Sequence, residues 1–158
     1  MNETPLLQST KTYYNLPCAH RQWRHDGNCA LVHGYSRSVR FVFEAQTQDK
    51  CGFVVDFGDL KWLKDWLEHM FDHTLLLCDD DPLLHLFLKI EGQGACTIRL
   101  MPYGVGMEES AQLICEFADK ELRKRTKGRC WVALVESCEN DKNSAIYHNP
   151  ERGFKGWE

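Results

Sequence analysis

The chain of 158 residues carries 19 Lys and Arg against 23 Asp and Glu, a formal net charge of −4 that argues against nucleic acid as a partner. This length suits a single domain over residues 1–158 with its own apolar core. Neither a run of about 18 apolar residues nor the basic and apolar regions of a secretory signal is present, so we expect no membrane contact, a cytoplasmic location and eight reduced cysteines.

The first patterned segments indicate two strands and a helix. Apolar and polar side chains alternate over 38–44, which predicts a half-exposed strand with Arg40 and Glu44 on its polar face. A short second strand is predicted at 52–55. Asp56 is then positioned to cap a helix that begins near Gly58. The apolar stripe of this helix is typical of a core-facing surface and consists of Leu60, Leu63, Leu67, Met70 and Phe71.

The second half of the chain continues this alternation of helix and strand. A short helix is predicted over 82–90, where Pro82 suits the first turn, and a strand over 97–100. The longest helical pattern runs over 108–125, and the basic run 123–127 is interpreted as its last turn rather than as a phosphate-binding patch. A nearly continuous apolar run at 131–135 predicts a final, buried strand.

This order of elements favours an α+β fold. Strands that adjoin in sequence pair antiparallel most simply, and helices then cover one face of the sheet. A small open sheet of this kind leaves its edge strands unpaired. Edge-to-edge assembly of several copies into a closed barrel is therefore expected.

Candidate chemistry is concentrated between residues 18 and 35. His20 and His33 are possible ligands for zinc, which binds imidazoles and thiolates from separate backbone segments, and Cys29 is a possible reactive group. The alternative is that both histidines are ordinary, partly buried side chains and that Cys29 is a core thiol.

Five motifs follow one another along most of the chain. They are Ala19-His20-Arg21, Cys29-x3-His33-Gly34, the segment 52–61, Phe71-Asp72-His73, and a late strand ending at Glu136. Together they resemble the 6-pyruvoyltetrahydropterin synthase family, specifically the branch that contains the bacterial 6-carboxytetrahydropterin synthases of queuosine biosynthesis.

The resemblance implies a tunnelling fold. Each subunit would contribute a four-stranded antiparallel sheet with two main helices on one face, three subunits would close a barrel, and two trimers would stack into a homohexamer. It also implies active sites between subunits, a zinc ion in each, and 7,8-dihydroneopterin triphosphate as the substrate.

The resemblance further implies that three histidines hold Zn²⁺. His20 and His33 match two of them, but Tyr35 stands where the family has the third histidine. A phenol with a pKa of about 10 is a much weaker zinc ligand than an imidazole. His25 is the alternative third ligand, or else an exposed loop histidine beside Asp26.

The remaining family residues also have matches. Cys29 matches the catalytic thiolate that removes a carbon-bound proton, and Asp72 and His73 match an acid–base pair supplied by an adjoining subunit. Glu136 matches the carboxylate that anchors the pterin, the alternative being a charged residue that merely ends a strand. Glu108 matches a second substrate-binding glutamate, or is simply an acidic residue in the first turn of a helix.

The expected function is therefore a 6-carboxy-5,6,7,8-tetrahydropterin synthase-like lyase. Two alternatives remain: a 6-pyruvoyltetrahydropterin synthase, or a pterin-binding protein that has lost zinc-dependent catalysis. The tail 148–158 matches no motif and is interpreted as a surface extension, with Trp157 as its anchor.

Overall fold

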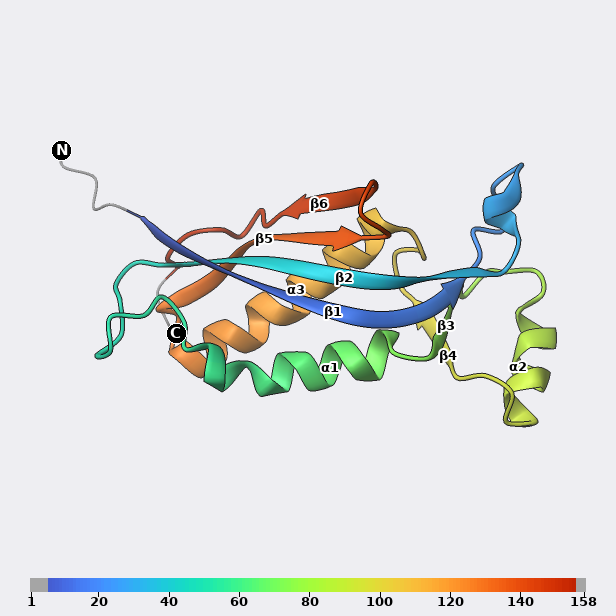
Figure 1. Ribbon diagram of the computed structural model, residues 1–158, viewed down its shortest axis with the longest axis horizontal. Coiled ribbons are helices and arrows are strands. Elements are labelled where there is room, and N and C mark those ends of the chain that lie inside the picture. The colour runs from blue at the N-terminus through green and yellow to red at the C-terminus, as the bar shows by residue number, and fades with distance from the viewer. Residues whose placement is uncertain (1–5, 156–158) are drawn as a thin grey trace.

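The computed structural model describes residues 6–155 and contains one curved sheet with helices packed along it (Figure 1). The strands are β1 (Leu7–His20), β2 (His33–Ala45), β3 (Thr74–Cys78), β4 (Ile98–Met101), β5 (Cys130–Cys138) and β6 (Ser144–His148). The helices are α1 (Lys61–Phe71), α2 (Leu84–Gly92) and α3 (Met107–Thr126), with short 3-10 turns at Asn28–Ala30 and Phe57–Leu60.

The sheet has six strands in the order β4-β3-β1-β2-β5-β6. β1, β2, β5 and β6 pair antiparallel, whereas β3 and β4 extend the β1 edge in the parallel direction. The predicted four-stranded, wholly antiparallel sheet is therefore wrong in the number of strands and in the direction of two of them. The reason is that α1 returns the chain along the sheet, so β3 runs beside β1 in the same direction.

α1 and α3 lie side by side on one face of the sheet, as predicted (Figure 1). The rings of Trp66 and Phe117 stack between them, with centroids 4.0 Å apart. The apolar stripe of α1 is confirmed, because Leu63 and Leu67 are fully buried. α3 contributes five side chains to the same core: Ala111, Ile114, Cys115, Ala118 and Leu122. Within residues 6–155, no helix combines the length and the apolar character needed to cross a membrane.

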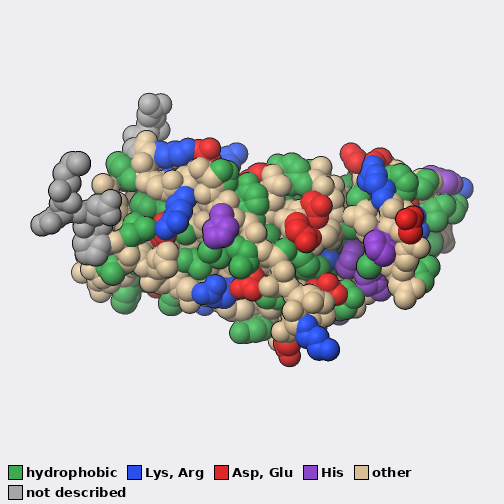
Figure 2. Space-filling model, turned by 90° about the horizontal axis from the view of Figure 1, so that it is seen from above, with side chains coloured by type: hydrophobic (Ala, Val, Ile, Leu, Met, Phe, Trp, Pro, Cys, Tyr) green, Lys and Arg blue, Asp and Glu red, His purple; other side chains and the backbone are tan. Residues whose placement is uncertain are grey.

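The loop between β1 and β2 and the helix α2 lie at the same end of the molecule (Figure 1). α2 buries none of its residues, so it adds little to the core. Seen from above, most of the visible histidine side chains gather at this end (Figure 2). The chemistry-bearing segment 18–35 thus lies at this end of the β1–β2 pair.

A β-bulge in β1 decides which of its side chains face the helices. The register with β2 shifts between Tyr13 and Leu16, and Asn15 adopts a left-handed φ of 59°. Asparagine tolerates this conformation better than most residues. Because a one-residue shift reverses the faces of a strand, the bulge turns Leu16, Cys18 and His20 toward the side that Tyr13 faces.

Two predicted features of the segment before α1 have different outcomes. The strand expected at 52–55 is wrong, because this segment is a loop. The Asp49 carboxylate accepts hydrogen bonds from the backbone N–H groups of Cys51 at 2.8 Å and Phe53 at 2.9 Å, which satisfies locally the groups that a strand would pair. The cap at Asp56 is confirmed, since its side chain accepts from the Gly58 N–H at 2.8 Å, although a 3-10 turn precedes α1.

The later elements occur close to where they were predicted. α2, β4, α3 and β5 overlap the segments 82–90, 97–100, 108–125 and 131–135. The basic run does form the last turn of α3, which ends at left-handed Lys127 with the Gly128 N–H donating to the Arg123 carbonyl at 2.8 Å. β1, β3 and β6 were not predicted. β3 is buried at every position and so shows no alternation.

All eight cysteines are free. Cys78, Cys115 and Cys130 are buried, as expected for small apolar side chains, whereas Cys51 is exposed. Burial raises the pKa of Cys115 and of Cys130 to about 12, so both are neutral thiols near pH 7.

Glu44 carries a buried charge at the far end of the β1–β2 pair, which corrects its predicted position on an exposed face. Its side chain is 0 % exposed and accepts hydrogen bonds from Gln8 at 2.7 Å, Trp131 at 3.0 Å and Arg152 Nε at 2.8 Å. Burial by itself raises the pKa of Glu44, but these hydrogen bonds outweigh it and hold the pKa below its usual value.

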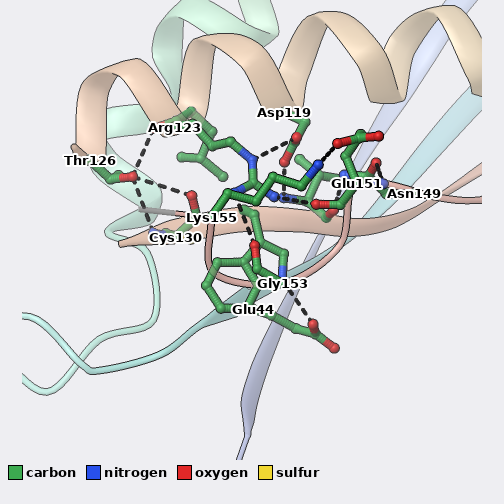
Figure 3. Close-up of polar contacts among 12 residues, drawn as sticks. Glu44, Asp119, Arg123, Thr126, Cys130, Asn149, Glu151, Gly153 and Lys155 are labelled. Atoms are coloured by element: carbon green, nitrogen blue, oxygen red, sulfur yellow. Dashed lines mark hydrogen bonds and ion pairs between the residues drawn. The ribbon is translucent and has the colours of Figure 1, made fainter. Parts of the chain in front are cut away.

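The described part of the C-terminal tail packs against this charge and against α3 (Figure 3). Arg123 donates to the Asp119 carboxylate at 2.8 Å and to the carbonyls of Glu151 at 2.8 Å and Gly153 at 3.0 Å. Asn149 Nδ2 donates to the Val132 carbonyl at 2.7 Å. The tail is thus anchored through 149–153; Trp157, the predicted anchor, lies outside the described residues.

Glu44→Gln tests how much this buried carboxylate stabilises the fold. The amide has only one acceptor oxygen for three donors, so the free energy of unfolding should fall by about 1–3 kcal/mol, the cost of unsatisfied buried groups. The matched control is Glu68→Gln, whose partner Lys64 is exposed and 3.6 Å away; it should cost less than about 0.5 kcal/mol. Equal losses in urea unfolding would contradict this assignment.

Candidate active site

The end of β1 and the start of β2 bring together the predicted metal-binding side chains. His20 and His33 are directly paired in the β1–β2 register, and their ring centroids are 4.4 Å apart. Tyr35 follows on the same face, 5.5 Å from His33 and 6.2 Å from His20. Gly34 permits this close pairing, because a Cβ atom there would meet the Cys18 carbonyl oxygen at 2.7 Å.

Cys29 lies in the loop between β1 and β2. Hydrogen bonds within the loop and with residues outside it hold this loop in place. The Gln22 N–H donates to the Cys29 carbonyl at 2.8 Å. Arg21 donates to the Ala30 carbonyl at 3.2 Å and, through Nε, to the buried Asp81 carboxylate at 2.7 Å. Cys29 is exposed on a single 3-10 turn, so its thiol is accessible.

A cavity of about 440 Å³ collects several of the predicted site residues. His20, His25 and Cys29 line one side of it, and Glu108 and Glu109 line it from the first turn of α3. Glu139 and Asn143 from the turn between β5 and β6, and Ser144 at the start of β6, complete the wall. The structure therefore brings Cys29, His20, His25 and Glu108 to one hollow.

Arg37 lies behind His20 and was not predicted as a site residue. It is 1 % exposed, and its Nη2 lies 3.0 Å from His20 Nδ1. Its other contacts are the Ser110 hydroxyl at 3.1 Å and the Val105 carbonyl at 3.3 Å. Burial first, and then the charge of Arg37, lowers the pKa of His20 to about 3. The available signal was an arginine two residues before Val39, on the apolar face of an alternating strand.

The hydrogen bonds of the histidines determine which of them presents a lone pair to a metal. A neutral imidazole has one N–H and one lone pair, and an arginine only donates. His20 Nδ1 therefore accepts from Arg37, so Nε2 carries the proton. His25 is in the same state, because its Nδ1 accepts from the Gly27 N–H at 2.8 Å. His33 is the reverse: its Nδ1 donates to the Leu31 carbonyl at 2.7 Å, and Nε2 keeps its lone pair.

Tyr35 is engaged elsewhere as well. The neighbouring Glu139 carboxylate raises the pKa of this phenol. Among the described residues, no three His, Cys, Asp or Glu side chains converge as metal ligands. With His20 and His25 presenting N–H groups and Tyr35 protonated, this donor set does not fit a three-ligand zinc site.

Asp72 and His73 form a close pair where α1 ends. His73 has a left-handed φ of 57°, and its backbone N–H donates to the Pro17 carbonyl at 2.7 Å. Its ring Nδ1 lies 2.5 Å from the Asp72 carboxylate, which orients the ring. The His73 side chain is 86 % exposed and lines a shallow hollow with Tyr35 and Thr74. It does not line the cavity that contains Cys29.

Glu136 lies on β5, beside the edge strand β6, near that cavity but not in its wall. It is paired in register with Arg40, whose Nη1 is 3.8 Å from the carboxylate. Ser144, which does line the cavity, donates its hydroxyl to Glu136 at 2.7 Å. Glu136 is thus separated from Cys29 within one chain, whereas Glu108 shares its cavity.

Comparison with known sequences identifies a family. A family model described as 6-pyruvoyl tetrahydropterin synthase matches residues 10–150. The 6-carboxy-5,6,7,8-tetrahydropterin synthase of Rickettsia conorii is 40 % identical over 63 residues, 39 % of this chain and 46 % of that protein. A probable enzyme of the same name from Halobacterium salinarum is 36 % identical over 86 residues, 54 % of this chain and 53 % of that one. The chain thus spans about half the length of the curated relatives that it matches.

Solved structures share the fold over nearly the whole chain. An uncharacterized protein of Wolinella succinogenes has a TM-score of 0.79 at 20 % identity, covering 92 % of this chain and 99 % of that one. A Plasmodium vivax 6-pyruvoyltetrahydropterin synthase variant has a TM-score of 0.65 at 19 % identity, covering 92 % of this chain and 99 % of that one. The Caenorhabditis elegans 6-pyruvoyl tetrahydropterin synthase has a TM-score of 0.60 at 19 % identity, covering 94 % of this chain and 99 % of that one. These likenesses confirm the predicted α+β fold.

Proposed function

Because the chain belongs to the 6-pyruvoyl tetrahydropterin synthase family, we propose that it is a lyase that converts 7,8-dihydroneopterin triphosphate into 6-carboxy-5,6,7,8-tetrahydropterin, for queuosine biosynthesis. The observation that carries the proposal is the accessible Cys29 thiol in a cavity shared with His20 and Glu108. The names of the matching relatives support the carboxy product over the pyruvoyl product.

In the proposed reaction, Cys29 is the base. As a thiolate it takes a carbon-bound proton from the substrate side chain and triphosphate leaves. Addition of one water, with cleavage of a side-chain carbon–carbon bond, then releases acetaldehyde and leaves the carboxyl group on the ring. The Asp72–His73 pair is suited to move protons, because the carboxylate fixes Nδ1 at 2.5 Å and leaves the other ring nitrogen free.

Two carboxylates are suited to bind the pterin ring. A carboxylate accepts two parallel hydrogen bonds from the 2-amino group and the ring N–H of a pterin. Glu136 and Glu108 are the candidates, and only Glu108 lines the same cavity as Cys29. If Glu136 is the anchor, it binds the pterin with the acceptor sites that the Ser144 hydroxyl leaves free.

The proposed active site is shared between subunits. Cys29 and His73 line different hollows of one chain, so direct proton transfer between them requires two copies. Two stacked trimers, in which sheets join edge to edge, would supply this arrangement and would cover the open sheet edges.

A pterin-binding protein without lyase activity is the second candidate. It is favoured by the hydrogen bond of His20 and the raised pKa of Tyr35, which do not fit the zinc site of the family. Product analysis by mass, with purified protein and 7,8-dihydroneopterin triphosphate, separates the two candidates and also separates the carboxy from the pyruvoyl product.

Cys29→Ala should abolish product formation while pterin affinity stays nearly constant, because the substitution removes the base and not the groups that bind the ring. Turnover is followed by mass and affinity by calorimetry. The matched control is Cys51→Ala, an exposed cysteine in a loop that does not line this cavity; its turnover should be unchanged. An unchanged rate in Cys29→Ala would rule out Cys29 as the base.

Glu136→Gln should weaken pterin binding by about 1.5–3 kcal/mol, the usual contribution of hydrogen bonds to a charged group. Glu108→Gln, measured in parallel by calorimetry, identifies the anchor if only one of the two variants loses affinity. Glu68→Gln on the exposed face of α1 serves as the control. Full affinity in both Glu136→Gln and Glu108→Gln would mean that the ring is bound elsewhere.

Mixing two inactive variants tests the shared active site. Cys29→Ala and His73→Ala should each be inactive alone, yet hexamers assembled from both should regain part of the activity, because some sites then combine an intact Cys29 with an intact His73. Light scattering provides the assembly state. A monomer at micromolar concentration, or mixed assemblies without any activity, would refute the arrangement.

A further inference from the structure

Arg37 is a buried cation without a carboxylate partner among the described residues. Its guanidinium contacts a hydroxyl, a carbonyl and an imidazole nitrogen, and its Nε, which is inaccessible to solvent, has no partner. Buried charges are normally paired with an opposite charge, because removing them from water is costly. A cation held this way beside a functional cavity calls for an explanation other than stability.

The contact between Arg37 and His20 is the reverse of what a metal ligand requires. A histidine that binds a metal usually donates its second N–H to a carboxylate or a carbonyl, which strengthens its lone pair toward the metal. His20, which lines the cavity, instead accepts from a permanent cation at Nδ1, and its other nitrogen, Nε2, carries the proton. A second positive charge bound to the same ring would also be repelled at short range.

We propose that Arg37 takes the place of the metal by holding His20 as an Nε2–H donor. The cavity then offers a hydrogen-bond donor with a fixed positive charge behind it. For the same reason the site does not bind zinc. The ligand feature recognised is an oxygen that carries or develops negative charge, such as a carbonyl or an enolate. That this oxygen belongs to the pterin side chain rests on the proposed function. The exclusion of zinc does not rest on the proposed function.

Tyr35 supports the same arrangement from the opposite strand. Glu139 raises the pKa of its hydroxyl, so the position at which the family has its third histidine holds a neutral phenol, a much weaker zinc ligand than an imidazole. Of the three imidazoles His20, His25 and His33, only that of His33 keeps the lone pair on Nε2. Arg37 is a positioning residue in this scheme, because it acts through His20 and does not line the cavity.

Zinc binding by a set of variants tests the proposal without any turnover. Each protein is incubated with zinc, dialysed, and analysed for metal content. Wild type and Tyr35→His should both remain substoichiometric, because Arg37 still engages His20 in each. The double variant Tyr35→His with Arg37→Leu should bind about one zinc per chain, since three imidazoles are then available. Tyr35→His with Arg37→Lys keeps the charge, so it should bind at least about tenfold more weakly than the Leu variant.

The tautomer of His20 gives a second readout, which is measured on the wild-type protein. In the wild-type ¹⁵N NMR spectrum, with His20→Gln used for assignment, His20 should show a bare Nδ1 and a protonated Nε2. Stoichiometric zinc in the wild type, or a protonated Nδ1, would overturn the proposal. So would activity that chelators abolish and zinc restores, although the proposed lyase function would then stand. Absence of product, with the expected tautomer and zinc analysis, would reject the lyase function alone.

Discussion

The antiparallel pairing of β1 with β2, from Leu7 opposite Ala45 to His20 opposite His33, is the constraint on which the rest of the structure depends. These two long strands form the centre of the sheet, and both main helices pack on their apolar face. The bulge at Asn15 determines to which face of the sheet each later side chain of β1 points. Without that extra residue, the alternation of β1 would turn His20 away from His33 and Arg37.

Each end of this strand pair holds a buried charge, and the two charges are treated differently. Glu44 is fully enclosed, but it accepts hydrogen bonds from three side chains, one of them the cation Arg152. Glu44 thus stabilises the fold and holds the C-terminal segment against the sheet. Arg37, by contrast, has only neutral partners among the described residues. This difference is why one charge is assigned to folding and the other to the cavity.

Local patterns were reliable where a single periodicity ran through an element. The stripe of α1, the Asp56 cap and the basic end of α3 all depend on contacts within a few residues, and all were confirmed. The strand expected at 52–55 failed because the Asp49 carboxylate binds two backbone N–H groups of that segment. Glu44 was assigned to an exposed face because its partners Trp131 and Arg152 are far away in the sequence.

The sequence by itself determined the family, the α+β class and the candidates Cys29, His20, His33, Asp72 and His73, because these depend on residue types at fixed spacing. Only the tertiary structure decided how those side chains are used. The protonation of His20 depends on Arg37, which lies on the neighbouring strand and faces the same side because of the bulge. A hydrogen bond between strands is set by register and facing, and a list of motifs contains neither.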